Sequence, residues 1–170
     1  LVTAHMPHSE LAGRLLGEAL GRKVALHARR HNDACLDQWM DAARHGAFSR
    51  TIAKKDRAAL LEALGDGEAV LYLGDQDFSY RNVFVPFFGV PAATVTALPG
   101  LMQASGAPAL PFWMQRRDDG RYVLRDEPQW PGWPTGDAAA DAARYMAELE
   151  AVVRRPPAPY PWVQRPLKAR

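Results

Sequence analysis

The sequence has little of what several common classes of protein require. Its 170 residues include one cysteine, Cys35, which excludes an intramolecular disulfide framework and a cysteine-rich zinc site. The formal net charge of +2 is too small to indicate nucleic-acid binding, so we expect no nucleic-acid partner. Every apolar run is shorter than the roughly 20 residues that cross a membrane as a helix. The sequence therefore predicts neither a scaffold stabilised by disulfide bonds nor a membrane-spanning helix.

Two common catalytic signatures are missing as well. The chain has no glycine-rich phosphate-binding loop and no Gly-x-Ser-x-Gly turn of the kind that carries a nucleophilic serine. Cys35 lies beside apolar residues in a segment predicted to be a helix. Nucleophilic catalysis by serine or cysteine is therefore disfavoured.

The composition is that of a folded domain. Hydrophobic residues make up 48% of the chain and charged residues 24%, which is enough to build a core. The length fits a single domain over residues 1–170. The first four residues resemble the end of a strand and carry no signal-peptide pattern, so we expect the chain to be part of a longer protein.

The order of the expected elements predicts an α/β fold. The apolar run at 69–73 ends at Gly74 and predicts a strand buried on both faces of a sheet. Further strands are expected at 1–4, 23–26, 83–88 and 107–115, the last returning as a hairpin through 121–125. Helices are expected at 9–20, 33–43, 56–65, 94–105 and 137–153. Pro99 should start, kink or split the fourth of these. Alternating strands and helices predict a layered, mostly parallel sheet flanked by helices.

The sharpest catalytic candidate is the pair formed by His5 and Glu10. His5 stands where a strand gives way to a helix, and active sites of α/β proteins form at strand ends. Residues five apart on one helix diverge by about 140°, so the two side chains can meet only if His5 precedes the helix. Glu10 would then hold the imidazole tautomer while His5 takes a proton. The spacing alone also fits an ordinary surface helix start, and His8 competes for the role of base.

A second candidate follows the predicted strand at 69–73. Asp75 and Asp77, separated by Gln76, form an Asp-x-Asp pattern that holds a divalent cation in many sugar-nucleotide transferases. Aspartate after glycine is also common in turns, so the pattern alone is a weak signal. His5 with His8 lacks a suitably spaced third ligand for zinc. We expect no metal at either place.

The last 20 residues carry five basic side chains and no acidic one. Tyr160 and Trp162 lie among them, and such aromatics favour membrane interfaces. Cations next to interfacial aromatics suit anionic lipid headgroups or an acidic protein partner. We expect the charges of Arg165, Lys168 and Arg170 to stay hydrated.

Several blocks, in this order and spacing, resemble the late acyltransferases of lipid A biosynthesis, the lauroyl/myristoyl transferase family. His5 and Glu10 resemble the family's catalytic His-x4-Asp/Glu motif. Arg44 with Gly46 resembles its arginine block. The remaining matching blocks are 54–56, 67–70, 75–77, 83–92, 106–112 and 160–170. The block at 83–92 is the most specific of these.

The resemblance implies a glycerolipid-acyltransferase-like fold and a specific reaction. An acyl chain would move from acyl-carrier protein to a hydroxyl of a lipid A precursor or a related glycolipid. His5 would be the general base, oriented by Glu10, while Arg44, Asp75 and Gln76 would bind substrate. No metal and no organic cofactor are implied. The enzyme would work at the cytoplasmic face of the bacterial inner membrane, anchored by an N-terminal part that precedes this chain.

Two other functions stay open at the level of sequence. Asp75 and Asp77 fit a metal-dependent glycosyltransferase, which would lose activity on chelation. A non-catalytic lipid- or carrier-binding relative also fits. The residues between His5 and Glu10 depart from the family's pattern, and Pro99 lies where the family has a regular helix.

Overall fold

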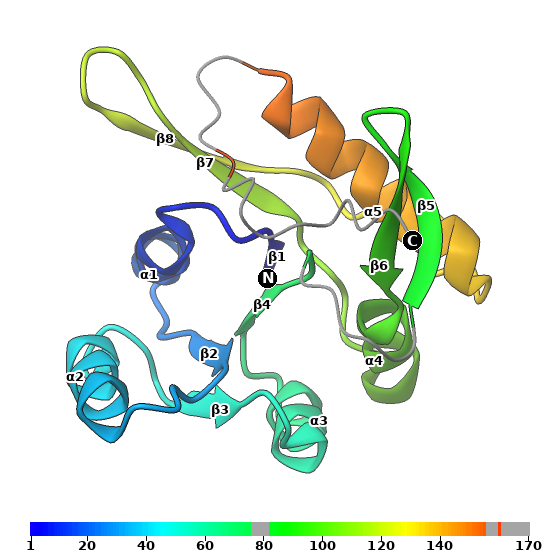
Figure 1. The fold of residues 1–170 in the computed structure, drawn as a ribbon. Coiled ribbons are helices and arrows are strands. Elements are labelled where there is room, and N and C mark those ends of the chain that lie inside the picture. Colours follow the sequence, from blue (N-terminus) through cyan, green and yellow to red (C-terminus); the bar gives the residue numbers. More distant parts are fainter. Residues whose placement is uncertain (76–81, 156–159, 161–170) are drawn as a thin grey trace.

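The computed structural model describes residues 1–75, 82–155 and 160. The elements follow in the order β1 (Val2–Thr3), α1 (Ser9–Ala19), β2 (Ala25–Ala28), α2 (Ala34–Arg44), β3 (Thr51–Ala53), α3 (Arg57–Gly65), β4 (Val70–Leu73), β5 (Asn82–Phe87), β6 (Val90–Val95), α4 (Ala97–Ser105), β7 (Phe112–Arg116), β8 (Tyr122–Asp126) and α5 (Ala138–Val153). Figure 1 shows the small central sheet with helices on either side. The predicted α/β class with a parallel sheet between helices is confirmed.

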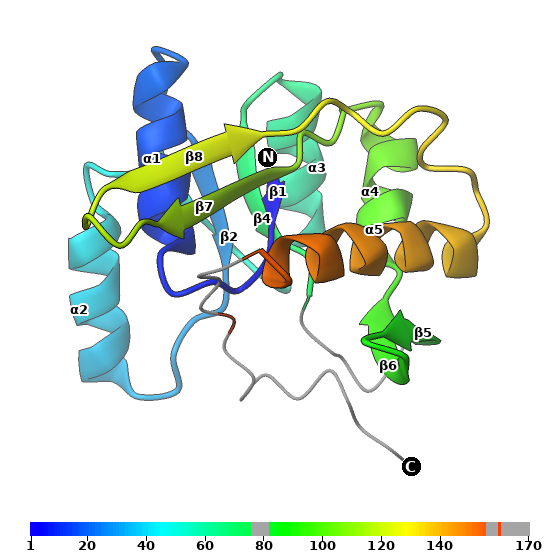
Figure 2. The same cartoon turned by 90° about the horizontal axis from the view of Figure 1, so that it is seen from above.

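The central sheet has four parallel strands in the order β1-β4-β2-β3. Strand β4, which lies inside the sheet, contributes side chains to two hydrophobic cores, because successive side chains of a strand point to opposite faces. Val70 and Tyr72 join the core under α3, α4 and α5, while Leu71 joins the core under α1. Figures 1 and 2 show α1 and α2 on one side of this sheet and α3 on the other. The continuous apolar run predicted this two-sided burial.

The helix expected around 94–105 is present as α4 (Ala97–Ser105), but the first two residues of that range belong to strand β6. β5 and β6 form an antiparallel hairpin, and Pro86 and Pro91 face each other across it. Its two-residue turn is Phe88-Gly89, where both φ values are positive, at 52° and 76°. α4 then begins at Ala97. Pro99 is its third residue, where a missing N–H removes no hydrogen bond within the helix, so no kink is needed.

Other elements agree with the sequence more closely. β7 and β8 form the predicted antiparallel hairpin. α5 begins after Asp137, whose side chain accepts hydrogen bonds from the backbone N–H groups of Ala139 and Ala140. β2 begins at Ala25, two residues later than predicted. Within the described residues no helix has the length and apolar character needed to cross a bilayer.

Polar and charged side chains gather at one edge of the parallel sheet. The carboxyl ends of parallel strands lie at the same edge, where α/β proteins bind ligands. His5 follows β1 and Asp75 follows β4, each two residues after its strand ends. Arg29 and Lys54 directly follow β2 and β3. The topology therefore brings a histidine, a carboxylate and two cations to one edge from four separate parts of the chain.

Candidate active site

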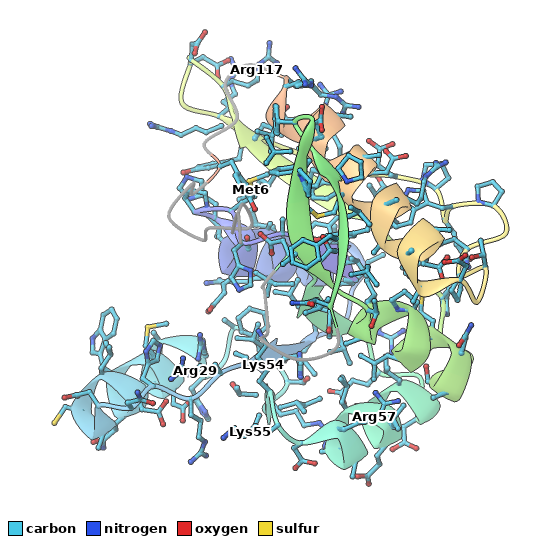
Figure 3. The ribbon with its side chains drawn as sticks, turned by 45° about the vertical axis from the view of Figure 1, so that its right-hand side comes forward. Met6, Arg29, Lys54, Lys55, Arg57 and Arg117 are labelled. Carbon is cyan, nitrogen blue, oxygen red and sulfur yellow. The ribbon has the colours of Figure 1, made fainter. Side chains whose placement is uncertain are left out.

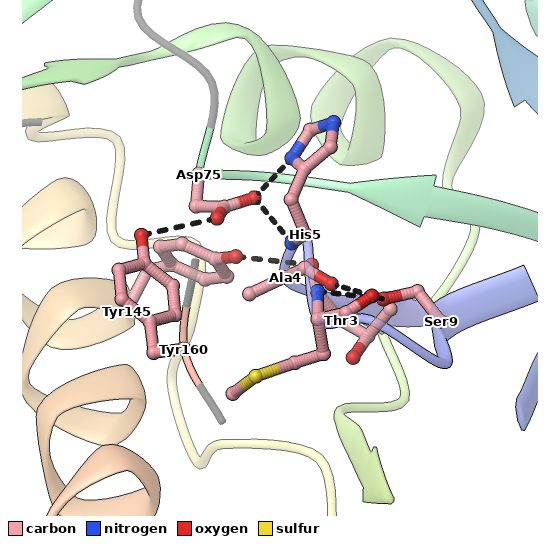
Figure 4. A network of polar contacts seen from close by, with 8 residues as sticks. Thr3, Ala4, His5, Ser9, Asp75, Tyr145 and Tyr160 are labelled. Atoms are coloured by element: carbon pink, nitrogen blue, oxygen red, sulfur yellow. Dashed lines mark hydrogen bonds and ion pairs between the residues drawn. The ribbon is translucent and has the colours of Figure 1, made fainter. Parts of the chain in front are cut away.

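His5 and Asp75 form the centre of the candidate site. Thr3 pairs with Leu73 across β1 and β4, so His5 and Asp75 occupy equivalent positions just past the two strands. The Nδ1 atom of His5 lies 2.6 Å from Oδ1 of Asp75, and the backbone N–H of His5 donates to the same oxygen at 2.8 Å. Figure 4 shows both contacts. Because the strands are neighbours, two residues 70 positions apart meet as a pair.

The burial of this pair sets what it can do chemically. The Asp75 side chain has no exposed surface, whereas a quarter of the His5 side chain is exposed. A carboxylate only accepts hydrogen bonds, so Nδ1 of His5 carries the proton that lies between them. In that tautomer the unprotonated Nε2 has a lone pair that can accept a proton. The arrangement is that of a general base held in one tautomer by a buried carboxylate.

Two tyrosines pack around the same carboxylate. The hydroxyl of Tyr160 donates to Oδ2 of Asp75 at 3.2 Å, and the hydroxyl of Tyr145 donates to the backbone oxygen of Thr3 at 3.0 Å (Figure 4). Burial raises the pKa of Tyr145 and of Tyr160, with the Asp75 charge adding to both effects. Both phenols therefore stay protonated and act as donors. Tyr145 lies so close to Gly74 that a Cβ there would be 2.9 Å from its ring.

The loop between β1 and α1 is held by a buried serine. The backbone N–H of Met6 donates to Oγ of Ser9 at 2.8 Å, and this hydroxyl lies 2.7 Å from the backbone oxygen of Ala4. Such local bonds hold the turn at a helix start. The loop that presents His5 is thus tied at both ends, which sequence reasoning did not identify.

Glu10 has a different partner from the one that the sequence suggested. Its carboxylate receives a two-pronged bond from Arg44, with Nη2 2.6 Å from Oε1 and Nε 3.0 Å from Oε2. Arg44 is buried, and its hydrogen bond to Glu10 is the largest cause that raises its pKa. Glu10 lies in the first turn of α1 and Arg44 is the last residue of α2, so the pair links two helices.

The expectation that Glu10 orients His5 is therefore corrected. In the described residues the His5 ring bonds to Asp75, and the Glu10 carboxylate bonds to Arg44. The physical reason is that Asp75 comes from the strand next to His5, whereas Glu10 lies on a helix that faces α2. Asp75, which the sequence assigned to substrate binding, makes the contact with the His5 ring that we expected of Glu10. Whether Glu10 and Arg44 act in catalysis stays a prediction.

A cavity of about 320 Å³ lies next to Arg44. Its walls include the guanidinium-bearing residues Arg30 and Arg50, together with Asp41 and His45. Arg50 also pairs with Glu68. The lining is rich in donors for oxygen-rich groups such as sugars and phosphates.

Two further cations belong to the same edge as His5. Arg29 lies in the loop after β2, and Lys54 and Lys55 lie in the turn between β3 and α3 (Figure 3). Burial lowers the pKa of Lys54, while the charge of Asp75 partly opposes this. Sequence reasoning counted these residues among scattered surface charges. Their position directly after strands was the signal that could have found them, but β3 was not predicted.

Several predicted residues lie outside the described part of the chain. Gln76 and Asp77 are among them, as are Trp162, Arg165, Lys168 and Arg170. In residues 1–75, 82–155 and 160, no three His, Cys, Asp or Glu side chains group in a way that could hold a metal ion. Both oxygens of Asp75 already receive hydrogen bonds, from His5 and from Tyr160.

Comparison with known proteins identifies the family. Residues 1–169 match the sequence model of the bacterial lipid A biosynthesis acyltransferases, and the chain belongs to this family. It is 33% identical to the lipid A biosynthesis lauroyltransferase of Escherichia coli K12 over 174 aligned residues, which cover all of this chain and 56% of the relative. The palmitoleoyltransferase of the same organism is 32% identical over the same span. A lipid A biosynthesis acyltransferase of Haemophilus influenzae is 29% identical over 175 residues. The chain thus spans a little over half the length of these relatives.

Proposed function

We propose that the protein is an acyltransferase that moves an acyl chain from an acyl-carrier-protein thioester to a hydroxyl of a lipid A precursor or a related glycolipid. The observation that carries this proposal is the His5–Asp75 pair at the carboxyl edge of the parallel sheet. Family membership supports the class of reaction and of acceptor. The glycerolipid-acyltransferase-like architecture belongs to the same proposal.

The reaction follows from the chemistry of the pair. Nε2 of His5 takes the proton of the acceptor hydroxyl while the hydroxyl oxygen attacks the thioester carbonyl carbon. The carbon–sulfur bond breaks, and the departing thiolate takes up the proton from the imidazolium. Asp75 keeps Nδ1–H in place and stabilises the imidazolium between these steps. This route uses no covalent acyl-enzyme, no metal and no organic cofactor.

Arg44 and Glu10 have a separate role in this proposal. A guanidinium binds oxygen-rich groups through a planar fork of donors, which a lysine cannot reproduce. Glu10 takes the Nε and Nη2 side of the Arg44 guanidinium and fixes its plane, so the remaining N–H groups would bind sugar or phosphate oxygens of the acceptor in the cavity beside Arg44. Arg29 and Lys54 at the sheet edge add positive charge near the base.

The proposed place of work is the cytoplasmic face of the bacterial inner membrane, in contact with the lipid surface. Helix α2 supports this, because Leu36 and Trp39 expose 44% and 66% of their surface. Tryptophan and leucine on one face of a helix favour a membrane interface. Arg29 and Arg30, exposed just before this helix, suit anionic headgroups.

The decisive experiment is mass spectrometry of lipids from a bacterial strain that lacks its own late acyltransferases and expresses this protein. The wild type should add one acyl chain to the lipid A precursor. His5→Ala should abolish the addition. His8→Gln is the matched control, because His8 lies three residues away and contacts the Tyr122 ring, so it should retain the addition.

Two outcomes would contradict the proposal. Lipid binding without any added acyl chain, at normal expression, would indicate a non-catalytic relative. Turnover that stops on chelation would indicate a metal-dependent transferase instead.

A further inference from the structure

Tyr160 occupies an unexpected place for a residue of the basic C-terminal segment. The sequence grouped it with aromatics that meet a membrane surface, yet only 5% of it is exposed. Its ring meets Phe87 edge to face at 6.0 Å between centroids. Its hydroxyl reaches Asp75, which lies 85 positions earlier in the chain. The residue therefore packs inside the domain and ends at the catalytic carboxylate.

The contact completes the hydrogen bonding of Asp75. Oδ1 of Asp75 accepts from the backbone N–H and the ring of His5, and Oδ2 accepts from Tyr160 (Figure 4). Donors on both oxygens fix the plane of a carboxylate. Without Tyr160, a wholly buried oxygen would lose this donor, which favours rotation of the group away from His5.

Two other titratable groups among the described residues lie near Asp75. Lys54 directly follows β3, and its charge and that of Asp75 act on each other, with Arg29 close by. Tyr145, from α5, gives its hydroxyl to the backbone of Thr3.

We propose that Tyr160 is a positioning residue for acyl transfer: its hydroxyl holds the second oxygen of Asp75 so that the first stays on the imidazole of His5. Tyr160 therefore supplies part of the active site. This inference rests on the proposed function for its kinetic readout, but its structural content can be measured separately.

The test variant is Tyr160→Phe, which removes the hydroxyl and keeps the ring on Phe87. In the full protein, kcat should fall about tenfold, as expected for one hydrogen bond to a charged group, while KM stays within about twofold. The Nδ1–H proton of His5, observed by NMR, should exchange with water about tenfold faster, because a carboxylate that rotates away no longer holds this proton.

Tyr145→Phe is the control, since it also removes a buried hydroxyl, but one that bonds to a backbone oxygen. It should lower stability without changing the exchange rate of the His5 Nδ1–H proton. Tyr160→Phe with an unchanged Nδ1–H exchange rate would overturn the proposal, whether or not the rate of acyl transfer falls. If the wild type shows no acyl transfer, faster Nδ1–H exchange in Tyr160→Phe still supports the positioning role, so failure of the proposed function is distinguishable.

Discussion

Two acid–base pairs begin within one short stretch of this chain, and they are built differently. His5 meets Asp75 across neighbouring strands, and the carboxylate is entirely inaccessible. Glu10 meets Arg44 across two helices, and 39% of the Glu10 side chain is exposed. In the first pair the contact uses only Nδ1 of the His5 ring, whereas the second is an ion pair between two helices. The difference teaches that strand adjacency, and not closeness in sequence, selects the partner of His5.

The largest expected effect is a loss of kcat when the buried His5–Asp75 pair is changed. Asp75→Asn keeps the shape of the side chain but removes the charge that stabilises the imidazolium, and its amide favours the wrong tautomer. We expect kcat to fall by about a thousandfold or more, measured with acyl-carrier-protein donor and glycolipid acceptor. A loss of less than about tenfold would mean that Asp75 does not hold the base.

The second prediction concerns the buried side chain of His27 on β2 and the change of the free energy of unfolding with pH. Burial, aided by the charge of Lys54, lowers the pKa of His27 from 6.5 to about 4, and its ring stacks on Tyr72 at 5.1 Å. The unfolded chain then binds the proton more readily, so stability is full above pH 6.5 and falls as pH drops toward 4. The loss amounts to about 3 kcal/mol at most.

Denaturant unfolding at pH 7.5 and pH 4.5 measures this effect. His27→Gln has no such proton to bind, so it should lose less stability than the wild type between the two values. Equal losses in both proteins would show that His27 is not the group responsible.

The sequence predicts features that depend on nearby residues better than contacts between residues that are far apart in the chain. The apolar run at 69–73, the helix at 137–153 and the β7–β8 hairpin are local patterns, and the structure has them. The helix start after His5 was also predictable from local residues. The contact of His5 with Asp75 was not, because it depends on which strands become neighbours.

The same limit explains the other differences. The split of residues 94–105 into β6 and α4 depends on pairing with β5, which offers β6 its hydrogen bonds. The burial of Tyr160 depends on the space beside Asp75 and Phe87. No periodicity in the sequence marks either feature.

A glycine next to the buried pair should be sensitive to a single methyl group. Gly74→Ala places a Cβ 2.9 Å from the Tyr145 ring, so the ring or the strand must shift. We expect a loss of about 1–3 kcal/mol in unfolding free energy, as for other overpacked cores. Gly100→Ala in α4 is the control, because nothing lies within 4 Å of its added Cβ. Equal stabilities for the two variants would contradict the tight packing.

The smallest expected effect is on the second pair. Glu10→Gln leaves Arg44 buried without its counter-charge and should cost about 1–2 kcal/mol, discounted for the exposure of Glu10. Glu18→Gln, which breaks the exposed pair with Arg14 on the same helix, should cost at most about 0.5 kcal/mol. Thermal or denaturant unfolding compares the two. If both variants lose the same stability, the Glu10–Arg44 pair behaves as an ordinary surface contact.

The most direct test of the central claim is a double-mutant cycle on acyl-transfer rates. His5→Ala, Asp75→Asn and the double variant are compared with the wild type, and the cycle is repeated with Glu10→Gln in place of Asp75→Asn. If Asp75 acts through His5, adding Asp75→Asn to His5→Ala lowers the residual rate no further, within about twofold. Adding Glu10→Gln, which acts through Arg44, lowers it again. The opposite pattern, in which Asp75→Asn multiplies the loss and Glu10→Gln adds nothing, would contradict the account and return the orienting role to Glu10.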